Sequence, residues 1–323
     1  MANPVGTFQT YQAIGNREDL ENMIYSISPT ETPFMQMAAR TKANMTKHEW
    51  QTDALKSAIG TNAAVEGDDP GNTTVSPSTR LFNYTQIATY AFNISGTQQA
   101  VKTAGRAEEL AYQLVKYSKA LKRDMETQLT QNACAAAGTS GAARVSAGME
   151  SWMSTNFTTT SSATSATSPG FSTVGAVSPV DATTQVTVTA AVVQLVIKGA
   201  WNAGGNPDVM MCGPYNKQKI SGFAGILTNT IQQRAGGQAT IIAAADSYQS
   251  DFGLFRVVPN RFNRDRTIAL LDMEYWAVAY LRPFQQFALS KTGDSDKRQI
   301  LAEYSLVSRN EAASGKVVDC STS

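Results

Sequence analysis

The clearest periodic pattern in the chain is a helical one between residues 104 and 134. Apolar residues recur there every three or four positions, which predicts one amphipathic face. They are Leu110, Leu114, Tyr117, Leu121, Met125 and Leu129. The stretch contains no proline, and Gly138 follows it. We therefore expect one helix roughly 45 Å long, enough to act as the spine of a domain.

Between residues 81 and 95, apolar and polar residues instead alternate with a period of two. The even positions are mostly aromatic or aliphatic and the odd ones mostly polar, which predicts a strand with one covered face. The even positions are Phe82, Tyr84, Gln86, Ala88, Tyr90, Phe92 and Ile94. Residues 46–55 offer a partner strand, and residues 56–80 are rich in Gly, Asn, Asp and Pro. A loop this long is unusual inside a compact domain, so residues 44–101 are expected to form a hairpin that projects.

The rest of the chain alternates between short helical and strand-like runs. We expect helices at 190–201 and 215–220, and strands at 209–212, 252–258, 268–271, 275–289 and 299–307. The first forty residues resemble an extended arm, because Pro29 and Pro33 disrupt helix formation. Residues 154–187 are half Ser and Thr, which is typical of a linker or of a short β-rich insertion. This order of elements predicts an α+β fold.

The amino-acid composition of the chain limits the classes of function that it can have. The 27 Lys and Arg residues nearly balance the 26 Asp and Glu residues, giving a net charge of +1. This balance does not support strong nucleic-acid binding. His48 is the only histidine, which excludes a two-histidine metal site and leaves one residue for histidine acid–base chemistry. The composition therefore disfavours an enzyme.

Motifs for chemistry are also missing from the sequence. Cys134, Cys212 and Cys320 are odd in number and far apart, so we expect three reduced thiols. No phosphate loop or nucleophile elbow occurs. No apolar run approaches the ~20 residues of a membrane span. We expect no catalytic residue, no metal, no cofactor and no membrane association.

Eight stretches spread from the arm to the last strand carry a resemblance to a known family. They are Ile27–Phe34, His48–Asp53, Ser95–Val101, Glu109–Leu114, Lys122–Glu126, Val258–Phe262, Glu274–Phe284 and Arg309–Gly315. In this order they resemble tailed-bacteriophage major capsid proteins of the Hong Kong 97-type fold, and more closely a podophage-associated capsid protein family. Only residues 154–187 and parts of 221–248 fall outside the resemblance.

The resemblance implies a division of the chain into limbs and domains. The expected parts are an N-terminal arm (1–43), an extended hairpin or E-loop (44–101), a peripheral domain with the spine helix (102–153), the Ser/Thr-rich insertion (154–187), an axial domain (188–274) and return strands of both domains (275–323). The loop 221–240 would then approach the axis of a capsomer.

The resemblance also implies a function. Copies of the chain would form pentamers and hexamers of an icosahedral-type shell around packaged double-stranded DNA, which they contact non-specifically. Hairpin residues would touch a neighbouring subunit, with these as candidates: His48, Trp50, Lys56, Phe82, Tyr84, Tyr90 and Phe92. Some relatives cross-link a hairpin Lys to a neighbour's Asn, for which Lys56 is a conceivable donor.

Expected partners are a portal, a separate scaffolding protein and a decoration protein. The expected location is the virion, after assembly in the host bacterial cytoplasm. Two other classes stay open: another β-rich phage structural protein, such as a tail or fibre component, and an enzyme using carboxylates or Ser. Fibre proteins show repeats, which this sequence lacks.

Overall fold

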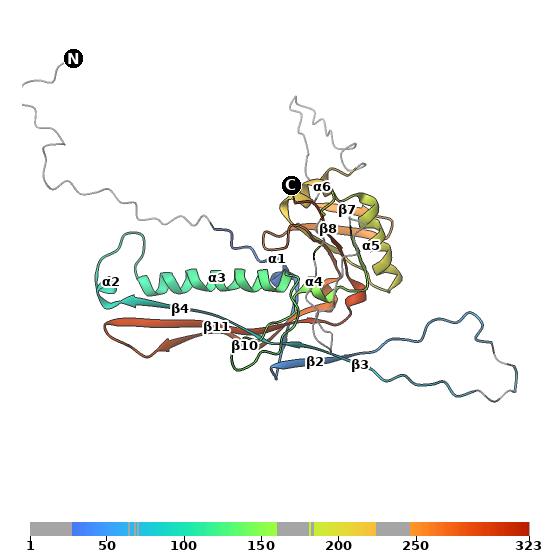
Figure 1. Cartoon of the computed structure of the whole chain (residues 1–323), viewed down its shortest axis with the longest axis horizontal. Coiled ribbons are helices and arrows are strands. Elements are labelled where there is room, and N and C mark those ends of the chain that lie inside the picture. Colours follow the sequence, from blue (N-terminus) through green and yellow to red (C-terminus); the bar gives the residue numbers. More distant parts are fainter. Residues whose placement is uncertain are drawn as a thin grey trace, which may run out of the picture.

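The computed structural model describes residues 28–159 except 64, 68 and 70, residue 181, residues 184–223 and residues 246–322. These residues form an elongated body that carries helix α3, a second block of helices and strands at one end of it, and a hairpin that projects beyond both (Figure 1). Helices and strands are mixed along the chain, as expected for an α+β fold.

A four-stranded sheet forms the elongated body and draws on the beginning, middle and end of the chain. Across the sheet the strands are β1 (Ala39–Lys42), β10 (Trp276–Leu289), β11 (Ser295–Ser308) and β4 (Gln86–Ser95). The β1–β10 pair is parallel, and the other two pairs are antiparallel. One side-chain hydrogen bond within it, from Thr89 to the carbonyl of Ile300, joins residues 211 positions apart.

Helix α3 (Glu109–Thr130) packs against this sheet and is the predicted spine helix. It is shorter than the expected span 104–134, because Gly105 has a φ of 76° and Gln131 is already extended. Its 22 residues make a rod of roughly 33 Å. Three apolar side chains in its C-terminal half are at most 1% exposed: Leu121, Met125 and Leu129.

A buried carboxylate ties α3 to the first described helix, α1 (Pro33–Met37). Glu126 Oε1 accepts a hydrogen bond from Phe34 N at 2.7 Å, and Oε2 accepts one from Met35 N at 2.9 Å. The Asn260 side-chain amide also donates to Oε1, at 2.8 Å. Burial raises the pKa of Glu126, and these three hydrogen bonds oppose the rise. One side chain thus joins three segments that are far apart in the sequence.

The second block is built on a six-stranded mixed sheet. Its strands, in order, are β5 (Phe157–Thr159), β12 (Gly315–Val318), β9 (Ile268–Leu271), β6 (Val209–Cys212), β8 (Gly253–Pro259) and β7 (Ser247–Ser250). Helices α5 (Ala190–Asn202) and α6 (Pro214–Ser221) belong to the same block. Strands β6 and β9 are buried at every position, which explains their uninterrupted apolar sequences.

An ionic cluster lies where helix α4 (Met149–Trp152) meets β12. Lys316 is 0% exposed, and its Nζ donates to the backbone carbonyl of Glu150 at 2.6 Å. The Glu150 carboxylate pairs with Arg264 Nη1 at 3.0 Å, and Arg264 also pairs with Asp181. Burial lowers the pKa of Lys316 to about 8, although the nearby charge of Glu150 opposes this shift.

The lowered pKa of Lys316 predicts a pH-dependent stability. Between pH 8 and the ordinary lysine value of 10.5, the unfolded chain binds more protons than the folded chain, so Lys316 makes the fold more stable as the pH rises. In urea unfolding at a series of pH values, the free energy of unfolding of the unmodified chain should rise relative to Lys316→Met, by up to about 3 kcal/mol. The exposed control Lys119→Met should run parallel to the unmodified chain. If the curve of Lys316→Met also ran parallel to that of the unmodified chain, the lowered pKa of Lys316 would be contradicted.

The predicted hairpin over residues 44–101 is divided at Thr85. Strand β2 (Lys47–Thr52) pairs with β3 (Thr79–Tyr84), whereas β4 leaves this pair and joins β11. The prediction of one continuous strand over 81–95 is therefore wrong, and the partner strand ends at Thr52 rather than at residue 55. The projecting hairpin consists of β2, β3 and the loop 53–78.

Buried polar contacts explain the turn at Thr85. Its backbone N–H donates to the carbonyl of Thr46 at 2.8 Å, and its hydroxyl donates to Glu303 at 2.8 Å. Arg144 and Arg282 both pair with Glu303, which is 2% exposed. Burial acts to raise the pKa of Glu303, but the bonds from Thr85 and Arg282 and the two arginine charges outweigh it and lower the pKa.

Other differences from the predicted elements are local. Strands β1, β7 and β12 and helices α1, α2 (Gly96–Ala100) and α4 were not predicted, because each has five residues or fewer and shows no usable period. Strand β11 begins at Ser295, four residues before the start of the predicted strand 299–307. Residues 1–27 of the arm, most of the Ser/Thr-rich insertion and most of the loop 221–240 lie outside the described residues. Among the described helices, none is both long and apolar enough to cross a membrane.

Candidate functional site

Five of the seven predicted contact residues lie in the projecting hairpin, whose neck is the β2–β3 pair. In this pair His48 lies opposite Asn83, Glu49 opposite Phe82, and Trp50 opposite Leu81. Because side chains alternate along a strand, the neck has two distinct faces. His48 and Trp50 share one face, and Phe82 shares the other with Glu49.

Trp50 anchors the first face to the chain's own body. Its ring lies 5.4 Å from that of Trp152, which is 0% exposed, and its indole Nε1 donates to the Ser308 carbonyl at 2.9 Å. The His48 ring lies 5.8 Å from the Trp50 ring, and partial burial lowers the pKa of His48. These partners of Trp50 lie within the same chain, and its predicted role as a neighbour contact stays a prediction.

The second face of the neck is open and charged. Glu49 pairs with Lys47 at 2.6 Å and with Arg80 at 3.5 Å. The Lys47 hydrogen bond lowers the pKa of Glu49. Lys47 Nζ also lies 4.1 Å from the ring centre of Phe82, and the ring of Tyr84 packs edge-on against Phe82 at 5.6 Å. Phe82 and Tyr84 thus remain half-exposed beside charged groups, and they stay candidates for an inter-subunit contact.

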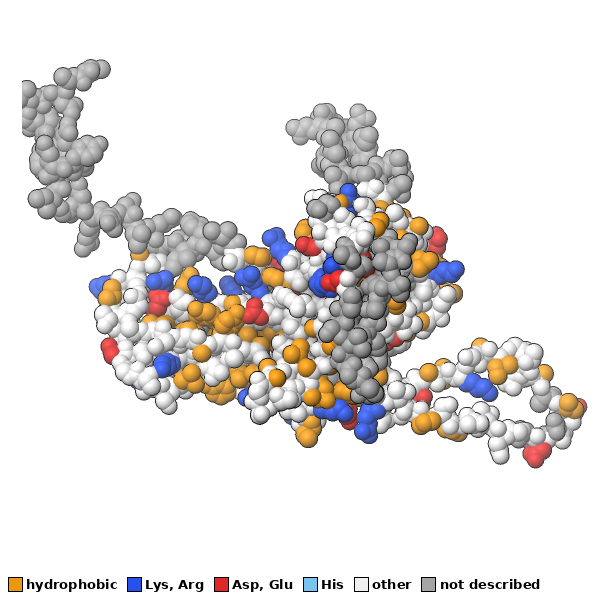
Figure 2. Space-filling model, in the orientation of Figure 1, with side chains coloured by type: hydrophobic (Ala, Val, Ile, Leu, Met, Phe, Trp, Pro, Cys, Tyr) orange, Lys and Arg blue, Asp and Glu red, His pale blue; other side chains and the backbone are white. Residues whose placement is uncertain are grey.

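Beyond the neck, the loop 53–78 extends away from the rest of the chain (Figure 1). The residues of the loop that the structure describes form no helix or strand, and hydrophobic side chains are scattered along it (Figure 2). Four of them are more than half exposed: Leu55 (99%), Val75 (89%), Val65 (75%) and Ile59 (52%). Two hydrogen bonds at its base, Ala54 to Asp53 and Ser78 to Gln51, stay within the hairpin. Lys56 lies in this loop and is exposed.

Tyr90 and Phe92 do not belong to the hairpin. Both lie on β4 and face α3, where the Phe92 ring stacks on that of Tyr117 at 5.1 Å and 15°. The Tyr90 ring lies 5.6 Å from Tyr117, and its hydroxyl donates to Asp124 at 2.5 Å, which raises the pKa of Tyr90. The covered face predicted for residues 81–95 exists at these two positions, but α3 of the same chain covers it.

These two environments predict unequal losses of stability from matched substitutions. Phe92→Ser removes a ring stacked against the spine helix, so we expect the free energy of unfolding to fall by about 2 kcal/mol. Phe82→Ser removes a half-exposed ring and one cation–π contact, so we expect a loss below about 1 kcal/mol. Urea unfolding of both variants measures the difference. Equal losses would show that the two faces have been assigned wrongly.

The described residues show no constellation for metal binding. No group of three or more His, Cys, Asp or Glu among them is arranged to hold an ion. Asp296, the second residue of β11, pairs with Lys291 at 2.7 Å and accepts a hydrogen bond from Gln99 at 3.1 Å. The Asp296 carboxylate thus has its ion-pair and hydrogen-bond partners within the chain.

Sequence reasoning missed two features of this region. Asn83 falls at a polar position of the alternating pattern, yet it is 0% exposed and its amide donates to the Leu306 carbonyl at 2.7 Å. Its Oδ1 accepts from Ala147 N at 2.9 Å. The exposed apolar residues of the loop were also missed, because they are isolated among Gly, Asn and Thr. A search for single apolar residues within an otherwise polar loop would have found them.

Comparison with known proteins gives one family. A family model described as SU10 major capsid protein matches residues 4–321. The major capsid protein of Escherichia phage Phieco32 is 40% identical to this chain over 126 residues. That alignment covers 39% of this chain and only 36% of the relative.

Solved structures share the fold over nearly the whole chain. The capsid asymmetric unit of cyanophage A-1(L) superposes with a TM-score of 0.68 at 13% identity, covering 98% of this chain and 99% of that one. A structure of phage G major capsid proteins and decoration proteins gives a TM-score of 0.53 at 11% identity, covering 99% and 100% of the two chains. The predicted Hong Kong 97-type capsid fold is thereby confirmed.

Proposed function

This chain belongs to the SU10 major capsid protein family, and on that premise we propose that its copies assemble into the closed, icosahedral-type shell of a tailed bacteriophage. The observation that carries the proposal is the projecting hairpin. Its loop 53–78 exposes four large apolar side chains, and the described residues of the loop include no buried hydrophobic side chain.

Such a loop is unfavourable in an isolated chain, because exposed apolar surface costs about 25 cal/mol per Å². The cost is relieved if the loop lies against another subunit. The neck that carries it is fixed to the body by Trp50 and Trp152, so the loop is presented in a defined direction. A rigid neck with an unsupported tip suits a contact between copies in a symmetric assembly.

The remaining parts of the chain fit the same proposal. The body with α3 and the four-stranded sheet corresponds to the peripheral domain, and the block with the six-stranded sheet corresponds to the axial domain. Pentamers and hexamers of such subunits would enclose double-stranded DNA. A net charge of +1 suits a wall that contains DNA without holding it tightly.

Partners and location follow from the proposed assembly. A portal and a separate scaffolding protein would take part in building the shell in the host cytoplasm, and the finished protein would reside in the virion. The phage G structure contains decoration proteins together with major capsid proteins. Because of this similarity, the proposal includes a decoration protein on the outer surface of the shell.

Electron microscopy of the purified recombinant chain tests the proposal. We expect closed shells or capsomer sheets, and sedimentation should show species far heavier than the 34.6 kDa monomer. A monodisperse monomer over a wide concentration range, with and without a co-expressed scaffolding protein, would contradict it. Elongated fibres in place of shells would favour the alternative of a tail or fibre component.

A further inference from the structure

Helix α3 carries a row of cationic side chains that its packing against the sheet leaves uncovered. Three of them are exposed and the fourth is partly buried, and together we call them the basic stripe: Lys116, Lys119, Lys122 and Arg123. Residues three or four positions apart are neighbours on a helix, so the four form one continuous surface roughly 10 Å long. Figure 2 shows lysine and arginine side chains along the edge of the body that carries α3.

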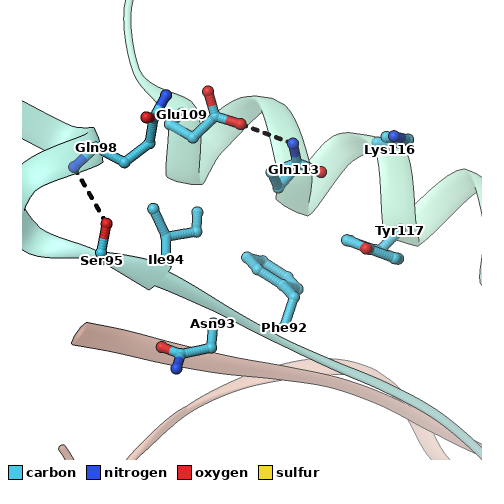
Figure 3. A pocket seen from close by; sticks show the side chains of 9 residues that line it. All are labelled: Phe92, Asn93, Ile94, Ser95, Gln98, Glu109, Gln113, Lys116 and Tyr117. Atoms are coloured by element: carbon cyan, nitrogen blue, oxygen red, sulfur yellow. Dashed lines mark hydrogen bonds between the residues drawn. The ribbon is translucent and has the colours of Figure 1, made fainter. Parts of the chain in front are cut away.

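The stripe points away from the sheet. In Figure 3 the Tyr117 ring extends from α3 toward Phe92 on β4, whereas Lys116 lies on the side of the helix away from β4. The Tyr117 and Phe92 rings stack, so the two neighbouring residues 116 and 117 separate the charged surface of α3 from its packed face.

The cations of the stripe are held in place without being neutralised. None of the four forms an ion pair with a carboxylate in the described part of the chain. Lys122 Nζ lies 5.8 Å from the ring centre of Phe284, and the guanidinium carbon of Arg123 lies 5.4 Å from that of Phe262. A cation–π contact orients a cation and leaves its charge in place.

The acidic residues of α3 are occupied by other contacts. Glu109 accepts a hydrogen bond from Gln113 at 2.7 Å (Figure 3), and Asp124 accepts one from the Tyr90 hydroxyl at 2.5 Å. Glu126 is 0% exposed. The stripe contributes +4 to a chain whose net charge is +1, so all other residues together carry −3. The balanced composition therefore hides one basic face.

Such a face fits a polyanion that is recognised by charge alone. Double-stranded DNA carries one negative charge per roughly 3.4 Å along each strand, so about three phosphates can lie opposite the stripe. Lysine binds phosphate as a point charge and carries no sequence information in doing so. A protein partner would need an apolar centre to its contact, and Val115 is the one large apolar residue that α3 exposes.

We propose that the basic stripe of α3 faces the interior of the shell and contacts the phosphate backbone of the packaged double-stranded DNA. This inference rests on the proposed function and names the surface of the wall that meets the DNA. Each copy offers only a few contacts, so the DNA is held weakly at any one point.

Salt-dependent DNA binding tests the ligand. The full chain, at concentrations below those at which sedimentation detects assembly, is titrated against a fluorescent DNA duplex of mixed sequence. Four phosphate contacts predict a slope of about −3.6 for log affinity against log salt. In the triple variant Lys116→Gln, Lys119→Gln, Lys122→Gln we expect a slope of about −0.9 and at least tenfold weaker binding at low salt.

Matched variants separate the stripe from charge in general. Arginine at the same three positions keeps the charge and should keep the affinity and the slope. The control Lys42→Gln, Lys56→Gln, Lys198→Gln removes three exposed lysines outside α3 and should bind DNA like the unmodified chain. Equal losses in the stripe variant and this control would overturn the proposal. So would a stripe variant that loses affinity for poly-glutamate but keeps its affinity for DNA, since the stripe would then be a surface for an acidic protein.

A labelling experiment tests which way the stripe faces. The chain with Lys119→Cys and Cys134→Ala, which removes the half-exposed native thiol, is coupled to biotin–maleimide and then assembled. Streptavidin is too large to enter a closed shell, so we expect it to capture the shells only after they are disrupted. The chain with Cys134→Ala alone gives the background. Capture of intact shells would place the stripe outside and overturn the proposal.

These outcomes leave the proposed function separately testable. Closed shells whose stripe faces outward, or whose subunits bind DNA independently of the stripe, overturn this inference alone. An unmodified chain that forms no shells would instead overturn the proposed function.

Discussion

Shell formation is lost when residues 53–78 are replaced by Asn-Gly: this is the largest effect we expect from any single change in the chain. Thr52 and Thr79 are directly paired at the end of the neck, so a two-residue turn closes the hairpin without disturbing β2 or β3. The shortened chain should remain folded and become slightly more stable, by about 2 kcal/mol, because a shorter loop costs less entropy to close.

Two measurements separate assembly from folding. Electron microscopy and sedimentation should show no closed shells, and urea unfolding should show an intact cooperative transition. A second variant, in which a Gly-Ser linker of equal length replaces residues 53–78, tests whether length alone is enough. We expect it to fail as well, because it lacks Leu55, Val65 and Val75. Closed shells from either variant would contradict the role given to the loop.

The largest expected effect on stability comes from Glu126→Ala. This change leaves three buried donors without their acceptor: Phe34 N, Met35 N and the Asn260 amide. Each unsatisfied buried donor costs about 1–3 kcal/mol, so we expect the free energy of unfolding to fall by about 3–5 kcal/mol. The exposed control Glu108→Ala should change it by less than about 0.5 kcal/mol. A small loss in Glu126→Ala would show that α1 is not held by this carboxylate.

Glu126→Gln adds a pH test to the same site. Because burial raises the pKa of Glu126 above its ordinary value of 4.5, the folded chain binds more protons than the unfolded chain above that pH. Stability contributed by this group is therefore fully present below pH 4.5 and falls as the pH rises through the folded pKa. The free energy of unfolding of the unmodified chain, relative to Glu126→Gln, should fall over this range. A pH-independent difference between the two would contradict a raised pKa.

The local pattern of apolar residues was enough to predict the spine helix α3. The residues at which this helix begins and ends were decided by the structure around it. The apolar stripe of α3 has the helical period throughout, so its existence follows from the sequence alone. Its start depends on Gly105, which adopts a positive φ that sequence patterns do not reveal. The same reasoning predicted most of β6, β9 and α5, whose apolar patterns are strong.

The hairpin shows why the candidate site was only partly predictable. The alternation from Phe82 to Ile94 is continuous, yet Thr85 turns the chain by bonding to Glu303, a residue 218 positions away. No local pattern contains that contact. The result is that Phe82 stays on the open neck, while Phe92 lies against α3. The position of β4 was unpredictable for the same reason, since it depends on pairing with β11 and on packing against α3, and no local pattern contains either contact.

The four-stranded sheet also has a consequence for protein synthesis. Strand β11 lies between β4 and β10, so β4 has no partner strand and β10 has only β1 until the ribosome has made residues 295–308. A nascent chain that stops earlier has an apolar β4 and α3 but no sheet to complete them. Truncated chains therefore cannot build the body of the subunit, and the topology itself excludes incomplete translation products from the assembled particle.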